Sequence, residues 1–76
     1  MECPVCGNTW VEDITPHPYD AKTFRCLSCG EYDIVASVYD VGALKALDPS
    51  KRKDALARAQ IVAVVGKRPR ITGYDL

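Results

Sequence analysis

The phrase Cys-x-x-Cys-Gly occurs twice in this chain, as CPVCG at residues 3–7 and as CLSCG at residues 26–30. These two phrases contain all four cysteines of the 76-residue sequence. The inner cysteines, Cys6 and Cys26, are separated by 19 residues, and two CxxC motifs about 15–20 residues apart are typical of a zinc site. The glycine after each pair permits the positive φ that a tight turn favours. We therefore predict that each phrase is half of one metal clamp.

Four thiolates of this kind fit Zn²⁺, which binds soft sulfur ligands in a tetrahedron with Zn–S distances of about 2.3 Å. The spacing predicts one Zn²⁺ per chain, held by Cys3, Cys6, Cys26 and Cys29. The same sulfurs also accommodate iron, so an iron electron carrier like rubredoxin is a weaker alternative, and a redox dithiol or disulfide is a third. His17, the only histidine, lies between two prolines, where we expect an exposed loop residue and not a ligand.

A four-cysteine site also bears on catalysis. Structural zinc sites use all four positions for protein ligands, whereas catalytic zinc keeps one position for water or substrate. The sequence shows no serine–histidine pairing, no glycine-rich phosphate loop and no pair of carboxylates with an evident role. We therefore expect a binding module and not an enzyme.

The residues around the two phrases have the pattern of β-strands. Residues 9–14 mix β-branched and aromatic side chains with polar ones, residues 23–25 lead into the second phrase, and residues 32–39 alternate between two faces. The prolines and aspartate of TPHPYDAK predict a loop between the first two strands. The expected fold class is a small metal-stabilised α+β protein, in which a zinc ribbon of about three antiparallel strands precedes one main helix.

The apolar residues change to a helical spacing in the second half. We expect Asp40 to cap a short helical turn, and Asp48 followed by Pro49 is a stronger start signal for the main helix. Gly66 is suited to a helix end, although the β-branched run IVAVV (61–65) is also compatible with a buried strand. We favour the helix, because alanines precede this run and a glycine follows it.

We expect one domain with two parts. Residues 1–39 form the ribbon, and residues 40–76 form the helical segment and a C-terminal tail that packs on it. A single core in so short a chain rarely supplies more than about 3–5 kcal/mol, so metal binding is expected to contribute folding free energy. We expect Trp10, Phe24 and Tyr32 to cover the metal and exclude water from it.

Charge is unevenly divided along a sequence whose formal net charge is zero. Residues 1–39 have a net charge of −4, and residues 40–76 have a net charge of +4. Basic residues gathered on one face can contact the phosphates of a nucleic acid, and the candidates here are Lys51, Arg52, Lys53, Arg58, Lys67, Arg68 and Arg70. The alternative is that these charges are solvated or paired within the chain, which the zero net charge favours.

The apolar run 61–65 raises the alternative of a protein partner. A ribbon with one short helix does not necessarily bury this run, and an exposed apolar stripe would mark a homodimer or another protein interface. We favour the opposing interpretation, that the run packs against the ribbon's own sheet.

The sequence also predicts the compartment. Its longest apolar run has five residues, far below the roughly 20 that span a bilayer, and no signal peptide is visible. We expect a cytoplasmic protein without membrane contact. Thiols stay reduced in the cytosol, which favours metal binding over structural disulfides.

With these motifs in view, CPVCG…CLSCGEYDIVAS, a helical region and GKRPRITGYDL resemble small zinc-ribbon segments of uncharacterised bacterial and phage proteins. The resemblance implies that Cys3, Cys6, Cys26 and Cys29 are zinc ligands, and it implies no defined activity. The CGE phrase at residues 29–31 is also similar to the zinc-binding half of bacterial antitoxins, in which a following helix contacts a toxin. Zinc ribbons of the transcription and ribosomal machinery are similar at the clamp alone.

The function that we predict from the sequence is a non-enzymatic zinc-binding module. The first interpretation is a nucleic-acid-associated or transcription-associated zinc ribbon that uses basic residues between positions 51 and 70. The alternative is a protein-interaction or antitoxin-like regulatory module that acts through the apolar helix and the tail.

Overall fold

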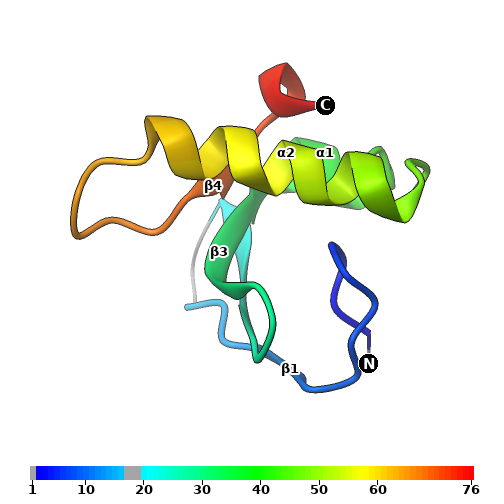
Figure 1. The fold of residues 1–76 in the computed structure, drawn as a ribbon, viewed down its shortest axis with the longest axis horizontal. Helices are drawn as coiled ribbons and strands as arrows, with labels where there is room; N and C mark the ends of the chain where they lie inside the picture. Colours follow the sequence, from blue (N-terminus) through cyan, green and yellow to red (C-terminus); the bar gives the residue numbers. More distant parts are fainter. Residues whose placement is uncertain (1, 17–19) are drawn as a thin grey trace.

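The computed structural model describes residues 2–16 and 20–76, so the prediction for His17 lies outside the described residues. The described strands form one sheet (Figure 1). In spatial order they are β1 (Val11–Asp13), β2 (Ala21–Cys26), β3 (Gly30–Val35) and β4 (Arg70–Ile71). The first three strands are antiparallel, whereas β4 lies parallel to β3.

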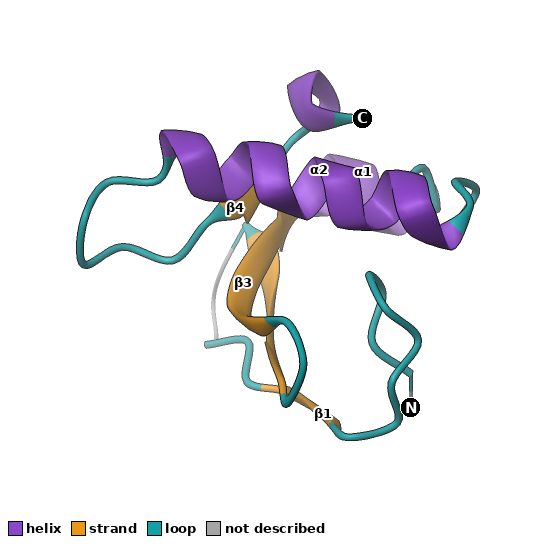
Figure 2. Cartoon of the chain, in the orientation of Figure 1, coloured by secondary structure: helices purple, strands orange, loops and turns teal. Residues whose placement is uncertain are grey.

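In the described part of the chain, three helical segments accompany the sheet, and Figure 2 shows the longest of them lying across its end. They are α1 (Ala36–Asp40), α2 (Pro49–Val62) and the 3₁₀ helix η1 (Gly73–Asp75). The predicted class, a small metal-stabilised α+β fold with one main helix, is confirmed. Among the described residues, no helix has both the length and the apolar character that crossing a membrane requires.

The third strand is shorter than the alternation predicted. It ends at Val35, and residues 36–40 form α1. The physical reason is the register, because Val35 lies opposite Ala21, the first residue of β2. Beyond that pair the backbone N–H of Ala36 still donates to the carbonyl of Asp20 at 3.1 Å, and the chain then turns into a helix that buries Val38. Asp40 is therefore the last residue of α1 and not the cap of a later helical turn.

The start of α2 matches the prediction, and its end does not. The Asp48 side chain accepts a hydrogen bond from the backbone N–H of Lys51 at 3.0 Å, and Pro49 is the first helical residue. The helix ends at Val62, before Gly66, because Ala63 adopts an extended backbone conformation. Residues 63–65 are thus neither helix nor strand.

The core lies between the sheet, α2 and the N-terminal cysteine loop. Phe24 and Tyr32 are fully buried in it, as expected, and their ring centroids lie 5.9 Å apart. Trp10 is different: it is 74% exposed, so the prediction that it covers the metal site is wrong. It directly precedes β1, and its backbone N–H is held by the Asn8 side chain at 2.8 Å while its ring points away from the core.

The residues after α2 return to the sheet. Ile71 pairs with Ile34 of β3 and is completely buried. The backbone N–H of Asp33 donates to the carbonyl of Pro69 at 2.9 Å, which fixes the approach of β4. Ile71 is therefore part of the core, whereas Tyr74 and Leu76 farther along the chain are exposed. The short parallel strand β4 extends the three strands that the sequence predicted.

Candidate metal centre

Two tight turns position the four cysteines. In the first, the backbone N–H of Gly7 donates to the carbonyl of Cys3 at 2.9 Å, and the N–H of Cys3 donates to the carbonyl of Asn8 at 2.8 Å. Gly7 has a φ of 77°, which a residue with a Cβ adopts only with strain. The second turn joins β2 to β3 and ends at Gly30, with a φ of 80°. The repeated glycine of the sequence motif therefore has the conformational role predicted for it.

Two further contacts hold the turns together. The backbone N–H of Leu27 donates to the carbonyl of Trp10 at 3.1 Å. The Asn8 side-chain amide donates to the Ser28 hydroxyl, also at 3.1 Å. The two halves of the clamp, whose inner cysteines are separated by 19 residues in sequence, are thus fixed against each other by the protein itself.

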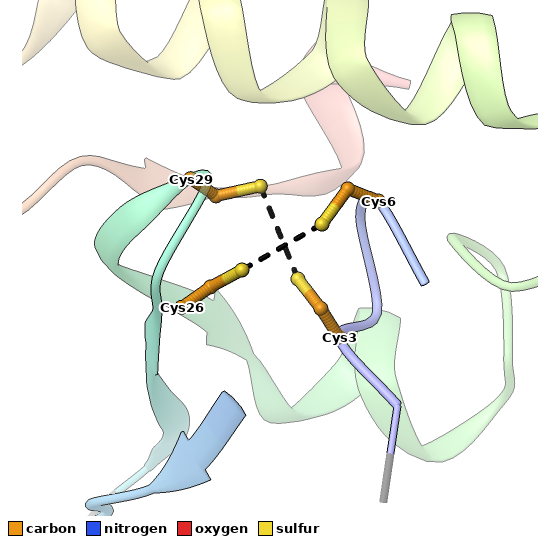
Figure 3. Close-up of side chains that lie close together, drawn as sticks. All are labelled: Cys3, Cys6, Cys26 and Cys29. Atoms are coloured by element: carbon orange, nitrogen blue, oxygen red, sulfur yellow. Dashed lines mark hydrogen bonds between the residues drawn. The ribbon is translucent and has the colours of Figure 1, made fainter. Parts of the chain in front are cut away.

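The four sulfur atoms converge on one point (Figure 3). All four lie within 4.8 Å of one another. The Cys3–Cys29 sulfur distance is 3.9 Å and the Cys6–Cys26 distance is 3.6 Å, and the two lines cross in Figure 3. A regular tetrahedron with metal–sulfur bonds of about 2.3 Å has edges of about 3.8 Å. The cysteines are free thiols and not disulfides, and their arrangement fits a single tetrahedral metal ion.

Tyr32 is directly linked to this cluster. Its hydroxyl oxygen lies 2.9 Å from Cys3 Sγ, and both side chains are buried. A metal-bound thiolate has no proton to give, so the tyrosine is the donor once an ion is bound. We expected Tyr32 only to cover the site. The hydrogen bond depends on which face of β3 meets the cluster, which the alternation of residues does not specify.

The thiols differ in how readily they ionise. Burial raises the pKa of Cys3, but hydrogen bonds from the Cys6 backbone and the Tyr32 hydroxyl outweigh this effect, and the pKa falls to about 7. Burial raises the pKa of Cys29, and the neighbouring thiols raise it further. The Cys6 pKa is also raised, chiefly by burial. Four thiolates so close together repel one another, and a divalent cation removes that repulsion.

Several of the basic residues considered as phosphate contacts have partners within the chain. The Arg68 Nε lies 3.0 Å from a carboxylate oxygen of Asp33, and its Nη1 lies 3.9 Å from Glu31. Arg70 lies 3.8 Å from Asp33 and 3.9 Å from Asp20. Intramolecular pairing, the alternative to phosphate contact, is therefore present at both of these arginines.

The remaining candidates lie on or near α2. The Arg58 Nε donates to the backbone carbonyl of Asp75 at 2.8 Å. Lys51, Lys53 and Lys67 are exposed, and Arg52 is half-buried. None of these three lysines forms an ion pair with another described residue.

Asp33 is a buried acidic residue that sequence reasoning did not single out. It is 4% exposed and accepts a hydrogen bond from the Thr23 hydroxyl at 2.8 Å, in addition to its contacts with Arg68 and Arg70. The alternation of residues in this strand gave no signal for it, because Asp33 is buried together with its neighbours Tyr32 and Ile34 on the other face. Asp33 links β2, β3 and the segment that carries β4.

The end of α2 has an apolar surface. Ile61, Val62, Val64 and Val65 are 70–99% exposed, so this run does not pack against the sheet. We call residues 61–65 the apolar segment. It contains no charged side chain, and the uncharged residues Gln60 and Gly66 flank it.

Comparisons with known proteins do not add a family to these observations: no protein-family model, no curated protein and no solved structure matches the chain. The cysteine cluster is consistent with a zinc-binding site, and the resemblance to zinc ribbons depends on these residues.

Proposed function

We propose that this protein is a non-enzymatic, zinc-stabilised protein-interaction module. The observation that carries the proposal is the exposure of the apolar segment at the end of α2, where Val65 is 99% exposed and Ile61 is 81% exposed. Soluble proteins scatter single apolar residues over their surface, whereas several neighbouring ones mark an interface.

The metal centre supports the non-enzymatic part of this proposal. All four tetrahedral positions are supplied by Cys3, Cys6, Cys26 and Cys29, which leaves no position for a substrate or an activated water. When bound, the metal cross-links the N-terminal loop to the β2–β3 turn. We propose zinc as this ion, because it has no redox chemistry and favours a closed tetrahedral thiolate site. Iron in the same site is the alternative, and elemental analysis of the purified protein distinguishes the two.

The occupant that we propose for the apolar segment is a second copy of the chain. The segment has no charge, so two copies can bring it together without like charges opposing each other. The formal net charge of zero also leaves no overall repulsion between copies.

The proposal is tested by sedimentation velocity of the metal-loaded protein over a range of concentrations. We expect a reversible monomer–dimer equilibrium in the wild type that Val62→Ser weakens. The matched control is Val41→Ser, since Val41 is equally exposed, at 76% against 75%, but lies in the turn after α1. A wild type that stays monomeric, or equal effects of the two substitutions, would contradict the proposal.

A nucleic-acid-associated role is a second proposal. It is supported by Lys51, Lys53 and Lys67, which are exposed and outside the intramolecular ion pairs described above. Its test is the salt dependence of binding to duplex DNA and single-stranded RNA, compared between the wild type and a Lys51→Gln/Lys53→Gln variant. Binding that weakens steeply with salt and is reduced in the variant would favour this role.

A further inference from the structure

Arg52 differs from the other four arginines of the chain. Each of the others has a partner within the protein, and they are Arg25 (with Glu31), Arg58 (with the Asp75 carbonyl), Arg68 and Arg70 (both with Asp33). Arg52 forms no ion pair within 4 Å with the described residues, although the Asp48 carboxylate at the start of α2 interacts with it electrostatically. Its Nε is buried without a hydrogen-bond partner. Unsatisfied buried donors are rare in folded proteins, so each one requires an explanation.

Arg52 lines a pocket of about 550 Å³. The pocket lies between the N-terminal cysteine loop and the start of α2, which are seen one below the other in Figure 1. Its apolar lining comes from core residues of β3, α1 and the following turn, namely Ile34, Val38 and Leu44, with Tyr39 beside them. Binding sites for small molecules commonly have volumes of about 300–1,000 Å³ with few polar groups in an apolar wall.

The charges that line this pocket favour an anionic group near Arg52. Lys45 is a second cation in the lining, and Glu2 is its one carboxylate among the described residues. A guanidinium pairs with a carboxylate through two parallel hydrogen bonds, of which one can come from Nε. Arg52 lines the pocket and is half-buried, so an acceptor that enters the pocket meets its side chain.

The metal centre limits where such an anion can lie. Cys3 also lines the pocket, and four thiolates around one divalent ion carry a net charge of about −2. A carboxylate is therefore disfavoured beside Cys3 and favoured beside Arg52 and Lys45. The apolar lining suits the remainder of the same ligand.

We propose that this pocket is a binding site for a carboxylate attached to an apolar body, with Arg52 as the residue that pairs with the carboxylate. This site is separate from the apolar segment, and the proposal does not depend on the proposed dimer. Two sources supply such a ligand: a free aliphatic acid, and the C-terminal carboxylate of a peptide that ends in an apolar residue.

The experiment is calorimetric titration of the metal-loaded protein with matched pairs of probes. Octanoate is compared with octanamide, and acetyl-Leu-Leu with its C-terminal amide, so each pair differs only in the carboxylate. We expect saturable binding of at least one carboxylate and weak or no binding of its amide. If octanoate binds, a free aliphatic acid is a sufficient ligand. If acetyl-Leu-Leu binds and octanoate does not, the ligand is the C-terminal carboxylate of a peptide.

Variants of the protein test whether Arg52 is the residue that binds the carboxylate. We expect Arg52→Gln to weaken carboxylate binding about tenfold or more, which corresponds to about 1.4 kcal/mol, and Arg52→Lys to weaken it less. Lys51→Gln, one residue away on an exposed position, should leave affinity within about twofold of the wild type. As a measurement that needs no variant, the Arg52 Nε–H signal in an ¹H–¹⁵N spectrum should shift on octanoate addition. No binding of either carboxylate, equal binding of the amides, or an equal loss in Lys51→Gln would overturn the proposal.

Discussion

The hydroxyl oxygen of Tyr32 lies 2.9 Å from Cys3 Sγ, and both residues are buried beside the cysteine cluster. Tyr32 stands on β3 and Cys3 in the N-terminal loop, so this contact couples the sheet to the metal centre. The low dielectric of a buried site strengthens a hydrogen bond to a charged sulfur. The same site disfavours ionisation of the tyrosine, whose pKa is raised by burial and by the Cys3 hydrogen bond. Tyr32 therefore stays a neutral donor to the thiolate.

Tyr32→Phe is expected to lower metal affinity about 10–100-fold, the usual effect of removing a group that supports a metal ligand. The substitution deletes only the hydroxyl and keeps the ring that packs against Phe24. Competition with a chromogenic chelator measures the change. Tyr39→Phe makes the same chemical change at a half-exposed position, 37% accessible, and should have little effect. Equal affinities of Tyr32→Phe and the wild type would show that this hydrogen bond does not support the metal.

Cys26→Ser is expected to abolish stoichiometric metal binding and cooperative folding. Cys26 is buried at the end of β2, and its loss leaves three sulfurs around an ion that requires four ligands. Elemental analysis and thermal melts before and after chelation check both effects. Leu27→Ala is the control, because its side chain lies in the same turn and is 82% exposed, and the variant should keep both its metal and a cooperative melt. A Cys26→Ser protein that retains its metal and a cooperative melt would refute the four-cysteine site.

Asp33→Asn is expected to reduce the free energy of unfolding by about 1–3 kcal/mol, since it removes the charge that Arg68 and Arg70 approach. This loss is smaller than the roughly 3–5 kcal/mol that removing one partner of a fully buried ion pair costs. The reason is that both arginines are about 40% exposed, so water partly screens their attraction to Asp33. Urea denaturation of the metal-loaded protein provides the measurement. Asp54→Asn, on the exposed side of α2, should change stability by less than about 0.5 kcal/mol. Similar losses in both variants would mean that the arginine contacts contribute nothing specific.

Ile71→Ala tests whether β4 belongs to the core. Ile71 is fully buried against Ile34, and truncation of such a residue typically costs about 2–5 kcal/mol through lost burial and the cavity left behind. Ile61→Ala is the same substitution at an 81% exposed position and should cost less than about 0.5 kcal/mol. Urea midpoints of the two variants are compared directly. If Ile71→Ala were as mild as the control, the return of the chain to the sheet would not be part of the stable fold.

The cluster of four cysteines, which could hold a metal ion, is the part of this protein that could be predicted best. Cysteine is rare, each CxxCG phrase is a local turn, and the ligand geometry of a metal ion restricts how the two turns can meet. The start of α2 was also predictable, because an aspartate cap followed by proline acts within a few residues. Such features depend on neighbours in sequence and not on the rest of the fold.

The features that sequence reasoning missed depend on contacts between distant residues. β3 ends at Val35, which is paired with Ala21, the first residue of β2. The alternation of residues 32–39 does not indicate where the neighbouring strand β2 begins. The 74% exposure of Trp10 is likewise a feature that its type and place in the sequence did not predict. The alternation of residues in one strand indicates that the strand has two faces. It does not indicate which face other elements cover, or how many residues of the strand they cover.

By itself, the sequence determined the clamp, the α+β class and the N-terminal end of the main helix, because these follow from ligand chemistry and local backbone preferences. Only the tertiary structure decided which charged side chains are paired and which apolar side chains remain exposed to solvent. Arg68 and Arg70 meet Asp33 only because β4 returns beside β3. Ile61 is exposed because it lies on the side of α2 away from its buried residues Ala55, Leu56 and Ala59. Pairing and burial are properties of two surfaces brought together, so they cannot be read from either segment alone.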